Sequence, residues 1–196
     1  MKTALLVLSF ICTAAFAADQ SPTRAVIHTT AGDINLTLFP KTAPATVANF
    51  VKLAQAKFFD GSTFHRVVPG FVIQGGDPNT KKGATGQPGT GTQLDAKGNP
   101  LLIKAEVGAA NPEKHTPGTL AMARGPDLNS ASCQFYVTLA ATPSLDGQYT
   151  VFGRVVGEAD LAVALKVKAD DRMTVEIIDP TDKKAVPAAA DAPATK

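Results

Sequence analysis

The sequence has little net charge, few cysteines and no long apolar run after its first 20 residues, and each of these shortages excludes a class of protein. Its 19 basic and 17 acidic residues leave a formal charge of +2, which is no signature of binding to nucleic acid or to a charged membrane surface. There are only two cysteines, Cys12 and Cys133. After the first 20 residues, no apolar stretch approaches the roughly 20 residues that a membrane-spanning helix needs.

Residues 1–17 are predicted to be a signal peptide. A single lysine precedes an apolar run over residues 4–11, and residues 15–17 (AFA) have the small-x-small pattern of a signal-peptidase site. We expect cleavage after this site and export to the periplasm, with secretion outside the cell as an alternative. The run is too short for a permanent anchor, and the bulky residues before Cys12 argue against a lipoprotein. Cleavage would leave Cys133 alone, which rules out an intramolecular disulfide.

The rest of the chain is predicted to form one domain with a short extension and a tail. Residues 18–24 are the N-terminal extension, and residues 25–179 have the length of an ordinary single domain. Residues 180–196 contain alanine, proline and charge without apolar periodicity, a composition typical of a disordered segment. Without a disulfide, the domain must be held together by its apolar core.

Most of the apolar pattern has a period of two residues, which indicates β-strands. Residues 24–39 are expected to form a hairpin, and further strand-like runs lie at 62–68, 71–75, 118–123, 134–140, 149–156 and 173–179. The strands come in consecutive runs and do not alternate with helices. This order favours a mainly β fold, a closed eight-stranded antiparallel β-barrel capped by two α-helices.

Two segments change to a helical period. The first is residues 41–56, in which one face carries Ala43, Val47, Phe50, Val51 and Ala54. Thr42 is placed to cap this helix, and Pro44 is tolerated only in a first turn. The second segment, residues 158–166, predicts a short helix.

Residues 77–106 form a long stretch without periodicity, which is usually either functional or disordered. Within it, GATGQPGTG at 83–91 is not followed by the Gly-Lys-Ser/Thr of a phosphate-binding loop. No metal site is predicted, because His28, His65 and His115 are scattered and lack ligands at suitable spacing. No serine stands in a nucleophile elbow, so a hydrolase is not indicated.

The faces of the predicted strands carry an unusual mixture of polar and apolar groups. Along the strand over 134–140, one face carries Gln134, Tyr136 and Thr138, and the other carries Phe135, Val137 and Leu139. The second face is typical of a core. A similar mixture places Val72 beside Gln74, and Arg66 belongs to a third strand. Taken one at a time, Gln74, Gln134 and Arg66 are interpreted more simply as solvated surface positions.

Four segments together carry a family resemblance. FHRVVPGFVIQGGDP, HTPGTLAMAR, SASCQFYVTL and SLDGQYTVFGRVVGE resemble, in this order, the cyclophilin-type peptidyl-prolyl cis-trans isomerases over roughly residues 25–179. The resemblance implies an eight-stranded barrel with two helices and an enzyme that rotates Xaa-Pro bonds and assists protein folding. It also implies that no cofactor and no metal is needed. Its partners would be proline-containing unfolded or flexible polypeptides, and we expect a monomer.

The family's functional positions transfer one at a time. The resemblance implies catalytic roles for Arg66, Phe71 and Gln74, and substrate binding by Val72, Ala123, Arg124, Gln134, Tyr136, Leu145 and Tyr149. Arg124 stands where many members have asparagine, and Tyr149 where many eukaryotic members have histidine. The family's Gly-Thr-Gly loop matches either residues 83–86 or residues 89–91. His65 is expected to be structural, and Asp146 to lie in a turn.

Two other classes of protein remain as alternatives. A proline-peptide binder or holdase would keep the groove without turnover, but a pure binder has no need of the cation at Arg66. A peptidase would need a nucleophile, and none is placed by the sequence.

Overall fold

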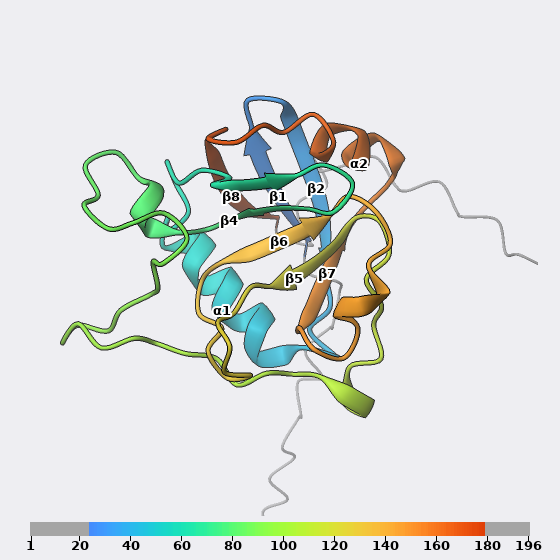
Figure 1. Ribbon diagram of the computed structural model, residues 1–196, viewed down its shortest axis with the longest axis horizontal. Helices are drawn as coiled ribbons and strands as arrows, with labels where there is room; N and C mark the ends of the chain where they lie inside the picture. The colour runs from blue at the N-terminus through green and yellow to red at the C-terminus, as the bar shows by residue number, and fades with distance from the viewer. Residues whose placement is uncertain (1–23, 179–196) are drawn as a thin grey trace, which may run out of the picture.

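The computed structural model describes residues 24–178 (Figure 1). The predicted signal peptide, most of the N-terminal extension and the predicted tail lie outside these residues. The strands are β1 (Arg24–Thr29), β2 (Gly32–Leu38), β3 (Arg66–Val68), β4 (Val72–Gly75), β5 (Thr119–Met122), β6 (Phe135–Thr138), β7 (Val151–Val155) and β8 (Met173–Ile178). The helices are α1 (Pro44–Gln55), α2 (Glu158–Ala164) and the short 3-10 helices η1 (Pro78–Thr80), η2 (Gly108–Ala110) and η3 (Pro143–Leu145).

All eight strands belong to one antiparallel sheet in the order β3-β4-β6-β5-β7-β2-β1-β8. The mainly β, eight-stranded prediction is therefore confirmed, but closure of the barrel is not, because the sheet curls into a half-barrel that stays open. The two edge strands, β3 and β8, are not paired with each other in the described chain. Next to these edges, residues 61–64 and 170–173 pair through the isolated bridge between Thr63 and Arg172 and through four backbone hydrogen bonds.

A cluster of phenylalanines forms the centre of the core. The ring centroid of Phe50, on α1, lies 5.3 Å from that of Phe59, 5.6 Å from that of Phe135 and 5.2 Å from that of Phe152. All four side chains are buried. Truncating a buried phenylalanine to alanine typically costs about 3–5 kcal/mol, so the contacts of Phe50 with Phe135 and Phe152 are a strong link between α1 and the sheet.

The first turn of α1 is capped by a residue far away in the sequence. The predicted cap, Thr42, is wrong: the N-cap is Ala43, which has no side-chain oxygen to offer. Instead, the carboxylate of Glu106 accepts hydrogen bonds from the backbone N–H groups of Ala45 and Thr46, each at 2.9 Å. A negative charge at a helix N-terminus also interacts favourably with the helix dipole. Glu106 thus fastens the end of the long loop to α1.

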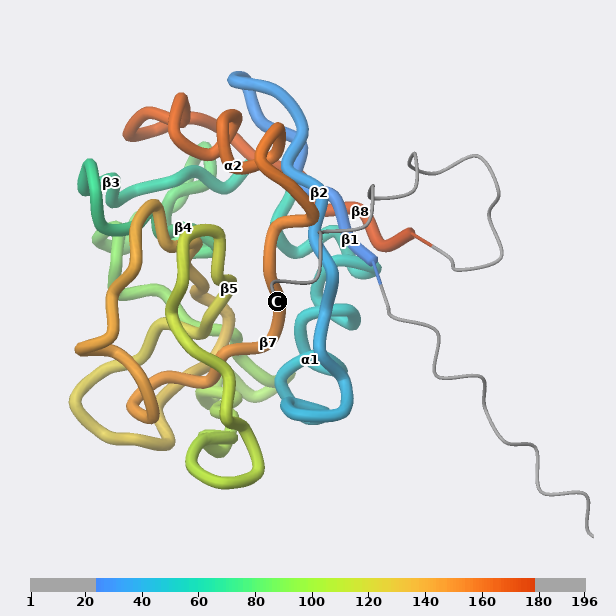
Figure 2. Tube along the Cα trace, turned by 90° about the vertical axis from the view of Figure 1, so that its right-hand side faces the viewer, coloured from blue at the N-terminus to red at the C-terminus, as the bar shows by residue number. Residues whose placement is uncertain are grey.

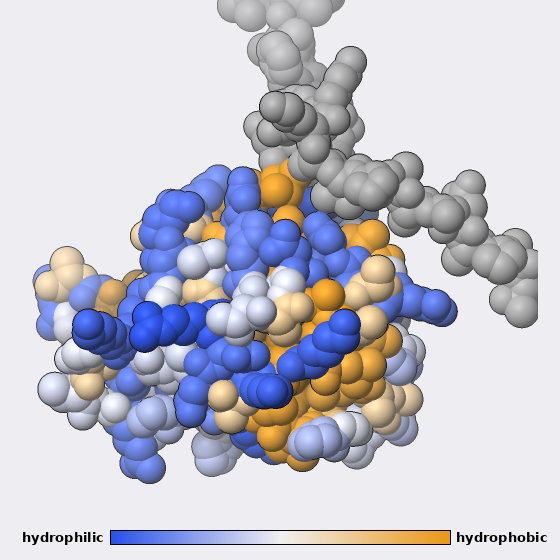
Figure 3. All heavy atoms as spheres, turned by 90° about the horizontal axis from the view of Figure 1, so that it is seen from above, coloured by the Kyte–Doolittle hydropathy of each residue, from blue (hydrophilic) through white to orange (hydrophobic). Residues whose placement is uncertain are grey.

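The helix α2 is held to the sheet by a buried carboxylate. Asp160 accepts hydrogen bonds from the backbone N–H of Asn35 at 2.8 Å and from its side-chain amide at 2.7 Å. Helix α1 contacts β8 and α2 contacts β2, and the two helices lie at opposite ends of the curled sheet (Figures 1 and 2). Within residues 24–178, neither is long and apolar enough to cross a membrane. Seen from above, polar and charged residues cover much of the surface and apolar residues gather in one area (Figure 3).

Candidate active site

The sequence-predicted site residues meet in two adjoining cavities. A cavity of about 320 Å³ is lined by Arg66, Phe71, Val72, Gln74, Ala123, Arg124, Tyr136, Leu145 and Tyr149. Gln134 lies in the second cavity, of about 410 Å³, which shares Gln74, Ala123 and Arg124 with the first. We call the first the proline cavity, after the ring that the family resemblance expects it to hold, and the second the side cavity. The structure therefore brings every predicted site residue together.

Strand register explains why these side chains share one face. Arg66 on β3 lies opposite Gln74 on β4, Gln74 lies opposite Tyr136 on β6, and Tyr136 lies opposite Ala121 on β5. Directly opposed residues of an antiparallel sheet point to the same side. A row across four strands thus places a cation, an amide and a phenol side by side.

A tight turn places Phe71 at the rim of the proline cavity. The backbone N–H of Phe71 donates to the carbonyl of Val68 at 3.0 Å across Pro69 and Gly70. Gly70 has φ +71°, so this is a type II turn, which favours proline and then glycine at its two central positions. The guanidinium of Arg66 lies 5.7 Å from the centre of the Phe71 ring. The Pro-Gly dipeptide therefore sets the aromatic wall beside the cation.

A chain of amides connects Arg66 to the interior. Nη1 of Arg66 lies 3.4 Å from Oε1 of Gln74, and Nε2 of Gln74 donates to Oε1 of Gln134 at 3.0 Å. Nε2 of Gln134 in turn lies within hydrogen-bond reach of the carbonyl oxygens of Gly91 at 2.9 Å and Gly89 at 3.1 Å. Because its amide nitrogen points to these carbonyls, Gln134 serves to orient Gln74 as well as to line the side cavity.

Asp77 anchors the start of the long loop, a role that the sequence did not suggest. Its side chain is fully buried and accepts hydrogen bonds from the backbone N–H groups of Asn79, Gly89 and Gly91. A Cβ built on Gly91 would lie 1.9 Å from Oδ1 of Asp77, so only glycine fits there. Gly89 and Gly91 also line the side cavity and residues 83–86 do not, which favours residues 89–91 as the match to the family's Gly-Thr-Gly loop.

His115 and Asp146, which the sequence analysis did not assign to the site, form a hydrogen-bond chain with the hydroxyl of Tyr136. The hydroxyl of Tyr136 lies 2.9 Å from Nε2 of His115, and Nδ1 of His115 lies 3.0 Å from Oδ1 of Asp146. Asp146 also accepts the backbone N–H of His115 at 2.8 Å. Nδ1–H must donate to the carboxylate, so the neutral imidazole offers Nε2 as an acceptor for the Tyr136 hydroxyl. The sequence did contain a signal for these two residues, since His115 lies in the segment HTPGTLAMAR and Asp146 in SLDGQYTVFGRVVGE, both of which carry the family resemblance.

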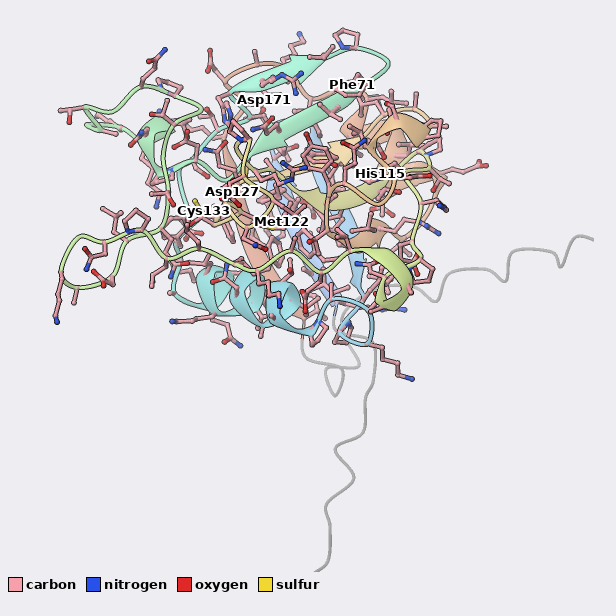
Figure 4. The ribbon with its side chains drawn as sticks, turned by 60° about the horizontal axis from the view of Figure 1, so that its bottom comes forward. Phe71, His115, Met122, Asp127, Cys133 and Asp171 are labelled. Carbon is pink, nitrogen blue, oxygen red and sulfur yellow. The ribbon has the colours of Figure 1, made fainter. Side chains whose placement is uncertain are left out.

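Burial keeps two members of this hydrogen-bond chain, His115 and Tyr136, neutral, while hydrogen bonds from His115 lower the pKa of Asp146 and keep it charged. Desolvation lowers the pKa of His115 below its ordinary value, although Asp146 acts in the opposite direction. Desolvation also raises the pKa of Tyr136 far above its ordinary value. In Figure 4, Phe71 and His115 lie toward the same end of the molecule. The proline cavity therefore has an uncharged wall at Tyr136 and a cation at Arg66.

Arg124 and Tyr149 form the opposite wall. The guanidinium of Arg124 lies 4.6 Å from the centre of the Tyr149 ring. Its Nε donates to the carbonyl of Gln148 at 3.1 Å, and its Nη1 donates to the carbonyls of Gly125 at 2.9 Å and Pro126 at 3.3 Å. The second cation of the proline cavity is thus held in one orientation.

The remaining cysteine does not contribute a nucleophile to the cavities. Cys133 is buried, and burial raises the pKa of its thiol to about 12. Among residues 24–178, no three histidine, cysteine or acidic side chains form a cluster that could hold a metal. What the site offers is an apolar hollow with guanidinium and amide donors at its edge.

Comparison with known proteins shows the family. The family described as cyclophilin type peptidyl-prolyl cis-trans isomerase/CLD matches residues 24–183. A peptidyl-prolyl cis-trans isomerase of Helicobacter pylori strain J99 is 40% identical over 157 residues, which are 80% of this chain and 88% of that protein. One from Synechococcus elongatus is 40% identical over 158 residues, which are 80% of this chain and 97% of the relative.

A solved structure agrees with the family match. The cyclophilin type peptidyl-prolyl cis-trans isomerase of Cryptosporidium parvum superposes with a TM-score of 0.66 at 26% identity, covering 81% of this chain and 99% of that one. The chain belongs to the cyclophilin family and is a peptidyl-prolyl cis-trans isomerase.

Proposed function

We propose that this isomerase accelerates Xaa-Pro rotation in exported polypeptides and assists their folding in the periplasm. The observation that carries the location is the short apolar run followed by the AFA cleavage pattern at residues 15–17. Exported chains cross the membrane unfolded and must reach native prolyl isomers afterwards. Uncatalysed prolyl isomerisation takes about 10–100 s, which is slow enough to limit folding.

We further propose that Arg66 is the catalytic cation. The prolyl bond has a rotation barrier of roughly 18–20 kcal/mol, while its cis and trans forms differ by only about 0.5–1 kcal/mol. The enzyme must therefore stabilise the twisted bond over both planar forms. With the ring held by Phe71, Val72, Tyr136 and Leu145, the guanidinium donates a hydrogen bond to the prolyl nitrogen as it becomes pyramidal. This stabilisation exists only in the transition state.

The amide chain supports this role for Arg66. Gln74 lies between Arg66 and Gln134, so the position of the guanidinium is linked to the loop at residues 89–91. A binder without turnover would need the apolar hollow but not this fixed cation. The substrate extends from the hollow past Ala123 as an added strand-like segment.

The test of the catalytic role is exchange NMR on a short Xaa-Pro peptide, without a coupled protease. Arg66→Ala should lose at least about tenfold in kcat/KM, since each tenfold corresponds to about 1.4 kcal/mol of transition-state stabilisation. Arg172→Ala is the matched control, because Arg172 is exposed and lines neither cavity. Wild-type exchange rates in a well-folded Arg66→Ala protein would contradict the role.

The test of the location is intact-mass analysis of protein from cell fractions. The proposal expects a periplasmic chain that begins at Ala18 and carries no lipid. A chain retained in the cytoplasm with residues 1–17 attached, or one acylated at Cys12, would overturn it. The role in folding is tested with an exported protein whose refolding is limited by prolyl isomerisation: the wild-type enzyme should remove the slow phase and Arg66→Ala should not.

A further inference from the structure

Arg124 differs from an ordinary surface arginine in how firmly it is held. Three backbone carbonyl oxygens accept hydrogen bonds from its Nε and Nη1 atoms, and the Tyr149 ring lies 4.6 Å below its guanidinium. These contacts occupy Nε and Nη1, which stand on either side of Nη2 in the planar guanidinium. Within the described residues, its Nη2 makes no hydrogen bond. A fixed guanidinium with unused donors is suited to binding an anion, because little side-chain entropy is lost when the anion arrives.

The two cavities that Arg124 lines contribute no negative charge to pair with it, among the residues that the structure describes. No aspartate or glutamate lines the proline cavity or the side cavity. Arg124 forms no ion pair in the part of the chain that the structure describes, whereas Arg154 is paired with Glu113 at 3.5 Å. Asp146 is already engaged by His115 and lies 3.6 Å from Lys114. The two cations of the groove, Arg66 and Arg124, are therefore left facing the space that a substrate fills.

The position of Arg124 separates its role from that of Arg66. Arg66 lines only the proline cavity, whereas Arg124 lines both cavities and stands at their border beside Ala123. A peptide with proline in the first cavity must pass Arg124 to reach the second. An extended chain advances about 3.3 Å per residue, so the guanidinium meets side chains within a few residues of the proline.

We infer that Arg124 is a specificity-determining residue that selects substrates with an aspartate or glutamate close to the Xaa-Pro bond. The carboxylate accepts a hydrogen bond from the unused Nη2 group, while Tyr149 and the three carbonyl groups hold the arginine in place. A carboxylate gains a charge-assisted hydrogen bond there, and a lysine meets two cations. The expected preference for glutamate over glutamine is about three- to tenfold in kcat/KM.

The experiment uses one parent Xaa-Pro peptide and varies six positions, the three before proline and the three after it. At each position in turn, glutamate, glutamine and lysine are compared. Exchange NMR gives kcat/KM for each peptide at low and at high salt. The wild-type enzyme should prefer glutamate over glutamine and glutamine over lysine at one position or more. This preference should shrink at high salt, because exposed charges are screened.

Variants assign the preference to Arg124. In Arg124→Asn, the glutamate-to-glutamine ratio should fall to about one, whatever the change in overall turnover. Arg124→Lys keeps the charge without the planar fork and should keep part of the ratio. Arg172→Asn removes an exposed arginine outside both cavities and should keep all of it.

Two results would overturn the inference. One is a wild-type enzyme that turns over glutamate, glutamine and lysine peptides equally at every position. The other is a preference that survives in Arg124→Asn, which would assign it to Arg66 or to the overall charge of the protein. If Arg124→Asn does not fold, the wild-type comparison and Arg124→Lys still decide the question.

Discussion

Removal of one hydroxyl group tests the hydrogen-bond chain behind the proline cavity. Tyr136→Phe keeps the aromatic ring and deletes the O–H group that lies 2.9 Å from Nε2 of His115. His115 is 2% exposed, so water cannot replace the lost donor. A buried acceptor left without a partner costs about 1–3 kcal/mol. With a urea m-value of about 2 kcal/mol/M, the midpoint of unfolding should fall by about 0.5–1.5 M.

The second tyrosine of the protein, Tyr149, provides a matched control. Tyr149→Phe also deletes a phenolic hydroxyl, but within the described residues Tyr149 contributes its ring to Arg124 and Tyr136 and no hydroxyl hydrogen bond. Its free energy of unfolding should change by less than about 0.5 kcal/mol. Tyr136→Phe should also keep more than about a tenth of kcat/KM, because the ring still lines the cavity and Arg66 is untouched. Equal urea midpoints for the two variants would refute the reasoning.

The remaining predictions concern buried titratable groups. Because burial lowers the pKa of His115 below its ordinary value of 6.5, its contribution to stability is present above that pH and is lost as the pH falls. Between about pH 7.5 and 5, the wild-type urea midpoint should therefore fall more steeply than that of His115→Gln, and parallel slopes would contradict this. Asp77→Asn replaces an acceptor of three backbone N–H groups with an amide, so stability should fall by about 1–3 kcal/mol, and an unchanged midpoint would show that the carboxylate is dispensable. In a Cys12→Ser chain, Cys133 should react with an aromatic disulfide reagent at least about 100-fold more slowly in the folded protein than in urea. The reason is that the thiol is buried and its pKa is raised to about 12. Equal reaction rates in the two states would exclude a buried thiol.

The strand pattern predicted the site face well, because side-chain direction in a strand is a local property. Alternation alone placed Tyr136 on one face of its strand and Val137 in the core. The Pro69-Gly70 pair likewise specified its turn, since φ preferences belong to single residues. The strands themselves are shorter than the predicted runs: of residues 62–68, only Arg66–Val68 pair as a strand.

Closure of the barrel was the feature of the architecture that the pattern predicted incorrectly. Periodicity identifies strands but does not say whether the first and last strands of a curled sheet come within hydrogen-bonding distance. Here β3 and β8 remain edges of the sheet, and only the residues next to them, 61–64 and 170–173, pair, through one isolated bridge and four backbone hydrogen bonds. Curvature depends on twist and packing summed over the whole sheet.

The sequence by itself determined the number of strands, the two helices, the turn at Phe71 and, through its family motifs, the reaction. The tertiary structure alone decided which distant groups satisfy one another. Glu106 caps α1 across 61 residues, Asp77 reaches Gln134 across 57, and His115 joins Tyr136 to Asp146 across 21 and 31. Local preferences act on neighbouring residues and leave a periodic signal in the sequence. A buried polar group needs only some partner nearby in space, and that requirement leaves no spacing rule to read.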